Sequence, residues 1–588
     1  MATTINARDG WSRISLPFIL VVAAIARFWR LDAKPLWLDE IITTLICLGR
    51  GPSDVPVDRP APFTLLPRIF TPRPGAGWTT VAHILSDPGV QHTHPPLFYF
   101  VMNAWFRLMP PAWGSLAWDV RVIPAVFGVA AVAAMAGTLR TAYPQRAGVA
   151  LIGASAMAVS PVMLLISEEA RNYTLATLLV VCALWLMVRI ARALLDGRPV
   201  PAMHWLAWTV VNAAACYAHY YALLAASAQG VALASLLYSR KRCRRADLGV
   251  WVSLAASLSG VLILFLPWMP TLAAHLQSPE QRWMTIWSPG SFVLDVLTSP
   301  ALFVAAGPGA SRLPILALPW VAAVAAFVIF IAFMTWRGSR LERADAESAP
   351  FTQLFAVFTA ALVLELVAAS IAARKDFLIS PRYSFVYYPG FCAVLAATLT
   401  ALPRISREFA CGLLIAAGVL SAVAIDTNLA FEKSFYPDSM GDNVNARPPG
   451  LIVIGYNSFH EICTGLGYLI AAEHENPDWK SADFAFARRS WDYEAFWHRA
   501  AEAHVLWTSA SALPATAAAG EWILAPGLDA SDFPALLRRD KSACRLDPTT
   551  IFDTNNNVRD ERGLWASRLR TTAHGSLYAW YDCASRAN

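Results

Sequence analysis

Charged residues are scarce in this chain. Asp, Glu, Lys and Arg together make up 15% of its 588 residues, whereas an ordinary soluble domain carries about 25%. Hydrophobic residues make up 56%. A soluble protein of this length would divide into several domains, each with a polar surface that this composition cannot cover. The composition therefore excludes a soluble enzyme, a disordered protein and a fibrous protein, and it indicates a membrane protein built of helices.

Cysteine is scarce as well, and neither sign of charge dominates. Nine cysteines in 588 residues do not make a disulfide framework, and a formal net charge of +6 does not predict a nucleic-acid partner. Three of the cysteines, Cys463, Cys544 and Cys583, lie in a polar C-terminal tail. Because three is an odd number, at most one disulfide can form within that tail.

Long apolar segments run through most of the chain before this tail. Segments of about 17–25 apolar residues are long enough to cross a bilayer as helices. We expect about eleven spans, over residues 14–30, 121–139, 147–166, 173–188, 204–217, 221–238, 248–268, 313–336, 351–373, 384–402 and 409–426. The fold class predicted for residues 1–429 is therefore an all-α polytopic membrane domain.

The loops between these segments carry their Lys and Arg residues on alternate sides. The basic loops are residues 140–146, 189–198, 240–245, 337–343 and 404–407. Short loops rich in Lys and Arg remain in the cytoplasm. With a cytoplasmic N-terminus, this pattern predicts eleven crossings of the plasma membrane and an extracytoplasmic C-terminal tail.

Two regions lie outside the predicted spans. Residues 31–120 are expected to form a large first external loop with interfacial helices, because the apolar stretch at 95–109 is short for a span and counting it would place every later basic loop outside. Within this loop, residues 51–77 are rich in Pro, Gly and Arg and are expected to be irregular or mobile. Residues 430–588 are polar, with β-like runs at 451–456 and 503–508, and they predict a small soluble α/β domain.

Polar residues that topology does not explain gather in the predicted outer turns. The groups are Asp39-Glu40, residues 91–97, residues 167–173, residues 219–221, Lys375 and residues 380–383. Each group taken alone is read more simply as a solvated helix end, an interfacial turn, a surface ion pair worth about 0–1 kcal/mol or an aromatic anchor. Their gathering on one side of the membrane favours a functional site.

The residue types restrict the chemistry of such a site. A carboxylate at the bilayer surface can act as a general base on a hydroxyl or amine, and arginine can bind a phosphate with a bidentate fork. A phosphate at the edge of the bilayer suggests a lipid-linked phosphate as the substrate. Histidines beside a carboxylate could also hold a divalent metal.

Seven pieces of sequence follow one another along the chain. They are Trp37-Leu38-Asp39-Glu40, His94-Pro95-Pro96-Leu97-Phe98-Tyr99, Arg121, Ser167-Glu168-Glu169-Ala170-Arg171-Asn172-Tyr173, Ala218-His219-Tyr220-Tyr221, Leu266-Pro267-Trp268-Met269-Pro270 and Pro381-Arg382-Tyr383. In this order they resemble the GT-C superfamily of membrane glycosyltransferases, which use polyprenyl-phosphate-linked sugars. That superfamily includes the protein O-mannosyltransferases, the lipid A aminoarabinose transferases and the rhizobial lipopolysaccharide galacturonosyltransferases. The resemblance covers residues 15–400 and is strongest to the last of these bacterial groups.

The resemblance implies roles for individual residues. Asp39 corresponds to the catalytic base of an external loop, and Glu40 is a second catalytic residue beside it. His94 corresponds to a residue near the donor phosphate, and Arg171 and Arg382 are assigned to the phosphate or a carboxyl group of the donor. The further substrate-binding residues that it implies are Arg121, Glu169, Tyr173, Tyr220, Lys375 and Tyr383.

The chain departs from the family just before the Pro-Pro motif. Many relatives carry an acid there, where this chain has Gln91, His92 and Thr93. A metal held by that carboxylate is therefore in question, although His92, His94 and His219 could form a different divalent metal site.

The function predicted from the sequence is an inverting glycosyltransferase of the bacterial inner membrane. It would move a hexose or pentose from a polyprenyl-phosphate donor to an acceptor of the cell envelope, which could be lipopolysaccharide, another glycan, a lipid or a protein. The N-terminus would be cytoplasmic and the C-terminal domain periplasmic, with membrane lipid as a partner and no nucleic acid.

Two alternatives remain open at this point. A transporter or flippase of lipid-linked sugars would place ionisable residues near the membrane midplane. Glu365 is the clearest acid there, whereas the other unusual residues lie at the outer rim, which favours the enzyme. In a third interpretation, the tail is a binding module on an inactive membrane core.

Overall fold

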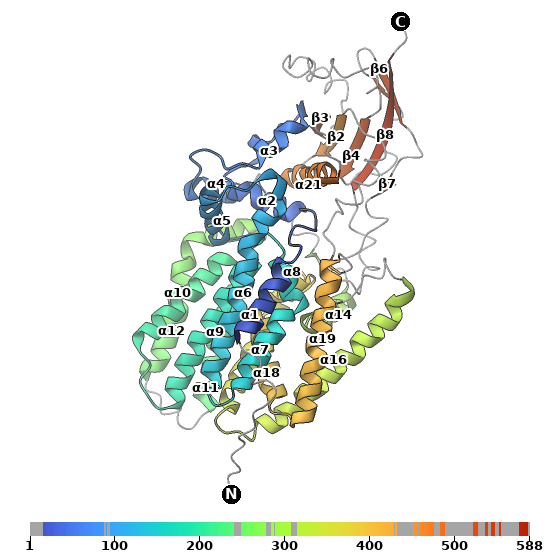
Figure 1. Ribbon diagram of the computed structural model, residues 1–588. Helices are drawn as coiled ribbons and strands as arrows, with labels where there is room; N and C mark the ends of the chain where they lie inside the picture. Colours follow the sequence, from blue (N-terminus) through green and yellow to red (C-terminus); the bar gives the residue numbers. More distant parts are fainter. Residues whose placement is uncertain are drawn as a thin grey trace.

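Long apolar helices form a bundle, and a mixed β-sheet lies beyond one end of it (Figure 1). The computed structural model describes residues 16–87, 90, 94–239, 248–277, 284–286, 288–306, 314–427, 430–431, 451–456, 458–475, 483–488, 521–526, 536–538, 542–546, 552–553 and 576–585. The fold class predicted from the sequence, a helical membrane protein with a small α/β domain after it, is confirmed.

Each of the eleven predicted spans overlaps a helix, and one of them is divided in two. The helices are α1 (Leu16–Phe28), α6 (Leu116–Ala142), α7 (Ala147–Val159) with α8 (Pro161–Ser167), α9 (Tyr173–Leu195), α10 (Ala202–Ala218), α11 (Ala222–Ser239), α12 (Leu248–Phe265), α16 (Pro314–Glu342), α17 (Ala349–Ala373), α18 (Tyr388–Thr400) and α19 (Arg404–Asp426). Within the described residues, seven helices are long and apolar enough to cross a membrane, and the bent pair α7–α8 makes an eighth. The count of eleven crossings stays a prediction.

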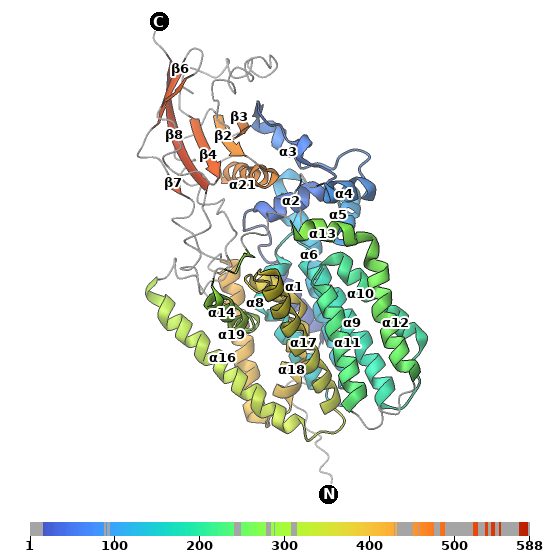
Figure 2. The ribbon, with the colours of Figure 1, turned by 180° about the vertical axis from the view of Figure 1, so that it is seen from behind.

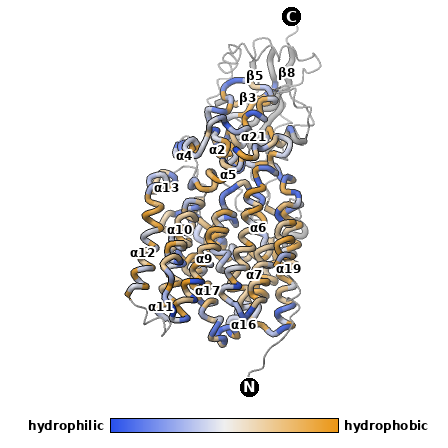
Figure 3. The backbone as a smooth tube through the Cα atoms, turned by 60° about the vertical axis from the view of Figure 1, so that its left-hand side comes forward, coloured by the Kyte–Doolittle hydropathy of each residue, from blue (hydrophilic) through white to orange (hydrophobic). Residues whose placement is uncertain are grey.

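The outer surface of the bundle is apolar. The helices of the bundle consist mostly of hydrophobic residues, with hydrophilic segments toward the two ends (Figure 3). On α12, for example, Val252, Leu262 and Ile263 are all more than half exposed. Exposed aliphatic side chains on a long helix are expected where lipid, rather than water, surrounds the protein.

The basic segments that the structure describes lie at the end of the bundle that is distant from the sheet. Arg146 follows α6 and forms an ion pair with Glu342 at the end of α16, with 2.5 Å between Nη1 and Oε2. Arg192, near the end of α9, donates from Nε to the main-chain oxygen of Thr141 at 3.1 Å. Loops that are far apart in the sequence therefore share one basic end, as the alternation of charge predicts.

A buried arginine holds the break between α7 and α8, where the two axes differ by 58°. Pro161 has no N–H to bond the carbonyl of Met157. Arg27 of α1 is buried and fills this role, because its Nη2 donates to the Met157 oxygen at 3.2 Å and its Nη1 to the Ala158 oxygen at 2.9 Å. Its Nε also donates to Ser167 Oγ at 3.2 Å. The bend and this bond together fix the position of the turn after α8.

Short elements of the first loop cover the opposite end of the bundle. They are α2 (Leu38–Cys47), α3 (Leu66–Ile69), α4 (Trp78–Ser86) and α5 (Leu97–Leu108), with α13 (Met269–Leu276), α14 (Pro289–Thr298) and α15 (Ala301–Val304) from a later connection (Figures 1 and 2). The expectation that residues 51–77 are irregular is wrong in part, because they contain α3 and strand β1 (Pro60–Pro62), and Phe63 and Phe70 among them are buried.

The sheet unites the first loop with the C-terminal tail. Its strand order is β1-β3-β2-β4-β8-β6-β5, with β7 paired to β8. The tail supplies β2 (Leu451–Tyr456), β3 (Asp483–Arg488), β4 (Glu521–Pro526), β5 (Leu536–Arg538), β6 (Ser542–Leu546), β7 (Phe552–Asp553) and β8 (Ser576–Ser585), and helix α21 (Phe459–Glu475). Strand β2 is parallel to β3 and β4, whereas β1 pairs antiparallel with β3. The second β-like run, at 503–508, lies outside the described residues.

The tail is docked onto the membrane part at several points. Gly467 of α21 packs so closely against α2 that a Cβ at this position would lie 3.1 Å from the main-chain oxygen of Leu36. Trp113 Nε1, just before α6, donates to Glu473 Oε2 at 2.9 Å, and Asp58 N donates to the Phe486 oxygen at 2.7 Å. The boundary predicted at residue 430 therefore separates two segments of the chain that share one sheet and one interface.

Candidate active site

The candidate site begins at the N-terminus of α2. Trp37 is in an extended conformation before the helix, and Asp39 and Glu40 occupy its first turn. Acidic side chains are stabilised there by the positive end of the helix dipole. The two carboxylates face different surroundings, because the side chain of Asp39 is 24% exposed and that of Glu40 is 0% exposed.

Two arginines from distant turns approach the Asp39 carboxylate. Arg171, in the turn between α8 and α9, has Nη2 at 3.5 Å from Asp39 Oδ2. Arg382, in the 3-10 turn Pro381–Val386 before α18, has Nη1 at 3.8 Å from the same oxygen. Arg382 also lies 3.6 Å from Glu169 Oε2 and places its guanidinium 4.6 Å from the centre of the Trp37 ring. Both distances to Asp39 are those of ion pairs without a direct hydrogen bond.

Arg171 is the link between three elements of the site. Its Nη1 donates to Thr43 Oγ1 at 2.9 Å and to the main-chain oxygen of Asp39 at 3.2 Å. Its Nη2 lies 2.5 Å from Nε2 of His94, just before α5. Burial acts to lower the pKa of this guanidinium, but Asp39, Tyr99 and Tyr173 together outweigh burial and raise the pKa of Arg171 above its ordinary value. Arg171 is therefore a permanent positive charge beside Asp39.

Glu40 is fully bonded inside the protein. Its Oε1 and Oε2 accept from Nε and Nη2 of Arg121, each at 2.7 Å, and Oε1 also accepts from the Ala170 N–H at 2.9 Å. The remaining N–H groups of Arg121 donate to main-chain oxygens of the segment that leads into α2. These are the oxygens of Leu31 at 2.9 Å, Lys34 at 2.8 Å and Pro35 at 3.0 Å. The pair fixes the segment that presents Asp39.

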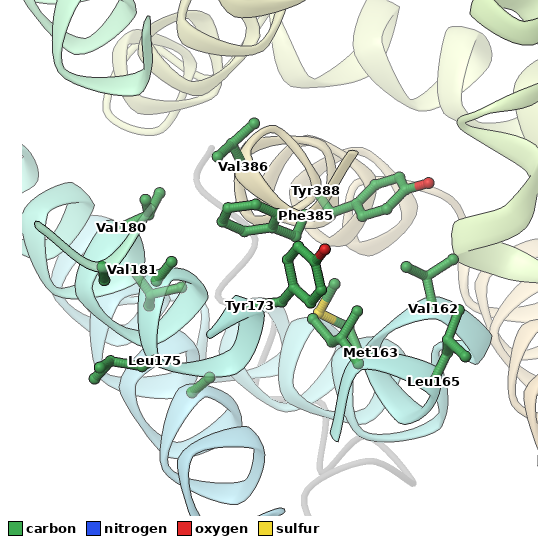
Figure 4. Packing of buried hydrophobic residues seen from close by; sticks show 14 of the residues in the cluster. Val162, Met163, Leu165, Tyr173, Leu175, Val180, Val181, Phe385, Val386 and Tyr388 are labelled. Carbon is green, nitrogen blue, oxygen red and sulfur yellow. The ribbon is translucent and has the colours of Figure 1, made fainter. Parts of the chain in front are cut away.

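An aromatic group packs behind the arginines. The ring of Tyr173 at the start of α9 lies 5.5 Å from His219, 6.2 Å from Tyr383 and 5.7 Å from Phe385, measured between ring centres. Figure 4 shows Tyr173 beside Phe385 and above Met163 of α8. This packing holds the turns that carry Arg171 and Arg382 against each other.

Several buried polar atoms of this group are unpaired in the described part of the chain. They are Arg171 Nε, Tyr173 Oη and His219 Nε2. Burial, and then the charge of Arg171, lowers the pKa of His219 to about 3, so its imidazole is neutral at physiological pH. Unpaired buried polar atoms cost free energy. They are expected at a site where a bound ligand completes their hydrogen bonds.

Two predicted site residues lie apart from Asp39. Tyr220 donates to or accepts from His275 Nδ1 at 2.8 Å and accepts from Trp268 Nε1 at 3.0 Å. These contacts place its hydroxyl on the side of α12 and α13. Lys375 follows α17 and donates from Nζ to the main-chain oxygen of Leu276 at 3.1 Å. The structure thus brings together Asp39, His94, Glu169, Arg171, Tyr173, His219, Arg382 and Tyr383.

The described residues do not assemble the metal ligands that the sequence suggested. No group of three His, Cys, Asp or Glu side chains fit to hold a metal occurs among them, and His92 lies outside the described residues. His94 and His219 are neighbours, with ring centres 5.4 Å apart. However, His94 Nε2 contacts the guanidinium of Arg171, and a cation at that nitrogen opposes a second, divalent cation. We therefore place no metal on these histidines.

The structure adds residues to which the sequence analysis assigned no role in the site. Lys34 pairs with Glu168 at 2.9 Å, Thr43 holds Arg171, and Trp37 lies under Arg382. His460, in the first turn of α21, interacts electrostatically with both Asp39 and Arg171. Nothing in the sequence signals that the helix of His460, 421 positions after Asp39, packs against α2, since no motif or period relates the two segments.

Comparisons with known proteins give similarities of backbone only. No family model and no curated protein matches the chain. ArnT from Cupriavidus metallidurans in the apo state is 11% identical with a TM-score of 0.48, over 96% of this chain and 97% of that one, and its form bound to undecaprenyl phosphate has the same identity and TM-score over 98% of both chains. The oligosaccharyltransferase of Archaeoglobus fulgidus, in a complex with Zn and sulfate, is 12% identical with a TM-score of 0.43, over 86% of this chain and 68% of that one. The chain is similar to these structures in the course of its backbone.

Proposed function

We propose that this protein is a membrane glycosyltransferase that moves a sugar from a polyprenyl-phosphate donor to a hydroxyl or amine of a cell-envelope acceptor. One observation carries the proposal. A single partly exposed carboxylate, Asp39, is approached by two buried arginines from separate turns, Arg171 and Arg382, where the apolar bundle ends. A base beside a paired phosphate-binding group at the membrane surface is what this reaction needs.

The reaction assigned to this geometry is a single displacement. Asp39 accepts the proton of the acceptor as its oxygen or nitrogen forms a bond to the anomeric carbon. The bond from that carbon to the phosphate oxygen breaks, and its electron pair leaves with the polyprenyl phosphate. Arg171 and Arg382 neutralise the charge of this leaving group. Direct displacement inverts the anomeric centre. The polyprenyl chain of the donor stays in the lipid beside the apolar bundle.

We assign Glu40 and Arg121 a role different from the one that the resemblance implies. Both are buried and bonded to each other, so neither has a polar atom left to reach a sugar or a phosphate. They are positioning residues that hold the segment before α2. Asp39 is then the single carboxylate of the motif that is available for proton transfer.

The transporter alternative rests on Glu365 in the middle of α17. Its Oε1 accepts from Ser227 Oγ of α11 at 2.9 Å, so this carboxyl group is hydrogen-bonded to a hydroxyl of a neighbouring helix. A transport pathway would connect such an acid to further ionisable groups across the membrane. The gathering of buried charged residues around Asp39, at the end of the bundle that faces the sheet, favours the enzyme.

The proposal is tested by supplying the purified protein in lipid nanodiscs with a panel of polyprenyl-phosphate sugars. Release of free polyprenyl phosphate, dependent on an envelope extract as the acceptor, is the expected result. Movement of intact lipid-linked sugar between leaflets without release of polyprenyl phosphate would support the transporter instead.

Arg382→Ala should raise the KM for the donor by about 10- to 100-fold, because a hydrogen bond to a charged group contributes about 1.5–3 kcal/mol. Arg382→Lys should recover part of this loss, since the charge remains and the fork is lost. Arg171→Ala should act in the same direction, with a larger loss because Thr43 and His94 lose their partner as well. The measurement is initial-rate kinetics with donor and acceptor varied separately.

The matched control for these variants is Arg404→Ala. Arg404 is exposed and pairs with Glu408 at the basic end of the bundle, so its loss should leave both KM values unchanged. Unaltered donor kinetics in both the Arg171 and Arg382 variants would exclude a phosphate at this position.

We also propose that the sheet end of the protein lies outside the cytoplasm, and a disulfide between Cys544 and Cys583 is then the expected result. Strands β6 and β8 pair antiparallel with these two residues opposite each other. Opposite residues in such a ladder have Cα atoms about 4.5–5.5 Å apart, a separation that a disulfide can span. Cys463 is buried and free in α21. Peptide mapping without reductant, after thiols are blocked, should find residues 544 and 583 linked.

The same orientation is tested independently by a reporter fused after Asn588. A reporter that is active only outside the cytoplasm should be active there. Free thiols at both positions, together with activity of a cytoplasmic reporter, would overturn the orientation and the location of the site.

A further inference from the structure

The C-terminal tail reaches the Asp39 site through one helix. Helix α21 lies between the sheet and α2 (Figure 1). Its Gly467 is at van der Waals distance from the segment before Asp39, because a Cβ there would lie 3.1 Å from the Leu36 oxygen and 4.0 Å from Ile41 Cγ1. Together with the Trp113–Glu473 hydrogen bond, this contact fixes α21 against the helix that begins with the proposed base.

His460 lies in the first turn of α21, seven residues before Gly467, and is therefore on the same face of the helix, the face that packs against α2. It is partly buried, and its electrostatic partners are Asp39 and Arg171, the base and one of the two arginines. Burial lowers the pKa of His460 to about 4, with the charge of Arg171 acting in the same direction and that of Asp39 opposing it. At physiological pH the ring is therefore neutral, and a neutral imidazole has one nitrogen that donates and one that accepts a hydrogen bond.

Under the proposed function, the donor and the acceptor reach Asp39 from different sides. Arg171 and Arg382 belong to turns of the helix bundle, on the side from which a lipid-linked phosphate arrives. His460 belongs to α21, which lies between α2 and the sheet (Figures 1 and 2). A side chain of α21 at the site therefore faces the acceptor, the substrate that comes from outside the membrane.

We propose that His460 binds the acceptor, holding its hydroxyl or amine by a hydrogen bond so that the proton to be removed faces Asp39. This inference rests on the proposed glycosyltransferase function and deepens it. The C-terminal tail is then a part of the active site that selects acceptors with a hydrogen-bonding group beside the nucleophile, such as the sugar hydroxyls of a glycan. The third interpretation of the sequence, a separate binding module on an inactive core, is replaced by one composite site.

The test is a KM analysis of His460→Ala, His460→Gln and His460→Phe in nanodiscs, with donor and acceptor varied separately. His460→Ala should raise the acceptor KM by about 3- to 10-fold, as expected for one hydrogen bond, and leave the donor KM unchanged. His460→Gln should recover part of the loss, because its amide can also donate and accept, whereas His460→Phe should not. The matched control is His83→Ala, since His83 is exposed on α4 at the same end of the protein.

The outcomes separate this inference from the proposed function. Thermal unfolding of each variant shows whether the docking of α21 is intact, and if His460→Ala is unstable the Gln and Phe variants decide. An unchanged acceptor KM in folded variants, or an equal rise in both KM values, would overturn the role of His460 while transfer by the wild type continues. Failure of the wild type to release polyprenyl phosphate from any donor would instead overturn the proposed function itself.

Discussion

Asp39→Asn should lower kcat by about 10²–10⁴-fold, the contribution of a positioned general base. Asparagine keeps the size of the side chain, and its amide oxygen can still accept a hydrogen bond from Arg171 or Arg382. The amide cannot, however, take up the proton of the acceptor. The donor is already activated, because its leaving group is a phosphate. One carboxylate close to the attacking atom is therefore sufficient, and its loss should appear in kcat more than in either KM.

The comparison variant for this prediction is Asp32→Asn. Asp32 lies in the same segment, seven residues earlier, and is exposed, so its loss should leave turnover unchanged. Near-wild-type turnover of Asp39→Asn, together with inactivity of Glu168→Gln or Glu169→Gln, would move the base to the turn between α8 and α9 and show that the assignment of Asp39 is wrong.

Arg121→Met should lower the free energy of unfolding by about 3–5 kcal/mol, because it leaves the buried carboxylate of Glu40 without its partner. The same change frees three main-chain oxygens of the segment before α2, which Arg121 holds at 2.8–3.0 Å. The double variant Glu40→Leu/Arg121→Met should recover part of the loss, since no uncompensated charge then remains. Unfolding in detergent, followed by circular dichroism, measures all three proteins.

The exposed pair Arg404–Glu408 serves as the control for this prediction. Arg404→Ala should change stability by about 0–1 kcal/mol, as expected for a pair in solvent. If Arg121→Met were as stable as this control, the ion pair with Glu40 would not be a structural clamp, and Glu40 would again be a candidate for contact with substrate.

The membrane helices could be predicted because their signal is local. Length and continuity of an apolar run are properties of one segment, so each expected span overlaps a helix. The break at Pro161 also has a local cause. Its stabilisation by Arg27 does not, because the bonds of that guanidinium reach carbonyls more than a hundred residues away.

The candidate site could be predicted in part, through topology. Alternate turns of a helical bundle meet at the same end, so the motifs of Asp39, Arg171 and Arg382 were expected to face one another. Pairing of individual side chains does not follow from topology. Glu40 and Arg121 were therefore assigned to catalysis and substrate, whereas the structure bonds them to each other, and Tyr220 and Lys375 bond to partners on the α13 side.

The domain boundary was the least accessible feature of the sequence. Strand β1 has only three residues, Pro60–Pro62, and two of them are prolines, which are depleted in strands. It takes its place at the edge of the sheet through pairing with β3, more than 400 residues later. A pairing at that separation leaves no periodic signal in the first loop, and the same holds for the packing of α21 against α2.

The most direct test of the central claim compares envelope glycans and polyprenyl-phosphate lipids in a strain that lacks this protein with those of the wild type. The account predicts that one envelope component loses a single sugar, that the matching polyprenyl-phosphate sugar accumulates, and that the wild-type gene restores both whereas the Asp39→Asn variant restores neither. Unchanged glycans and lipids in the deletion strain, or full restoration by Asp39→Asn, would contradict the claim that Asp39 is the base of a sugar transfer.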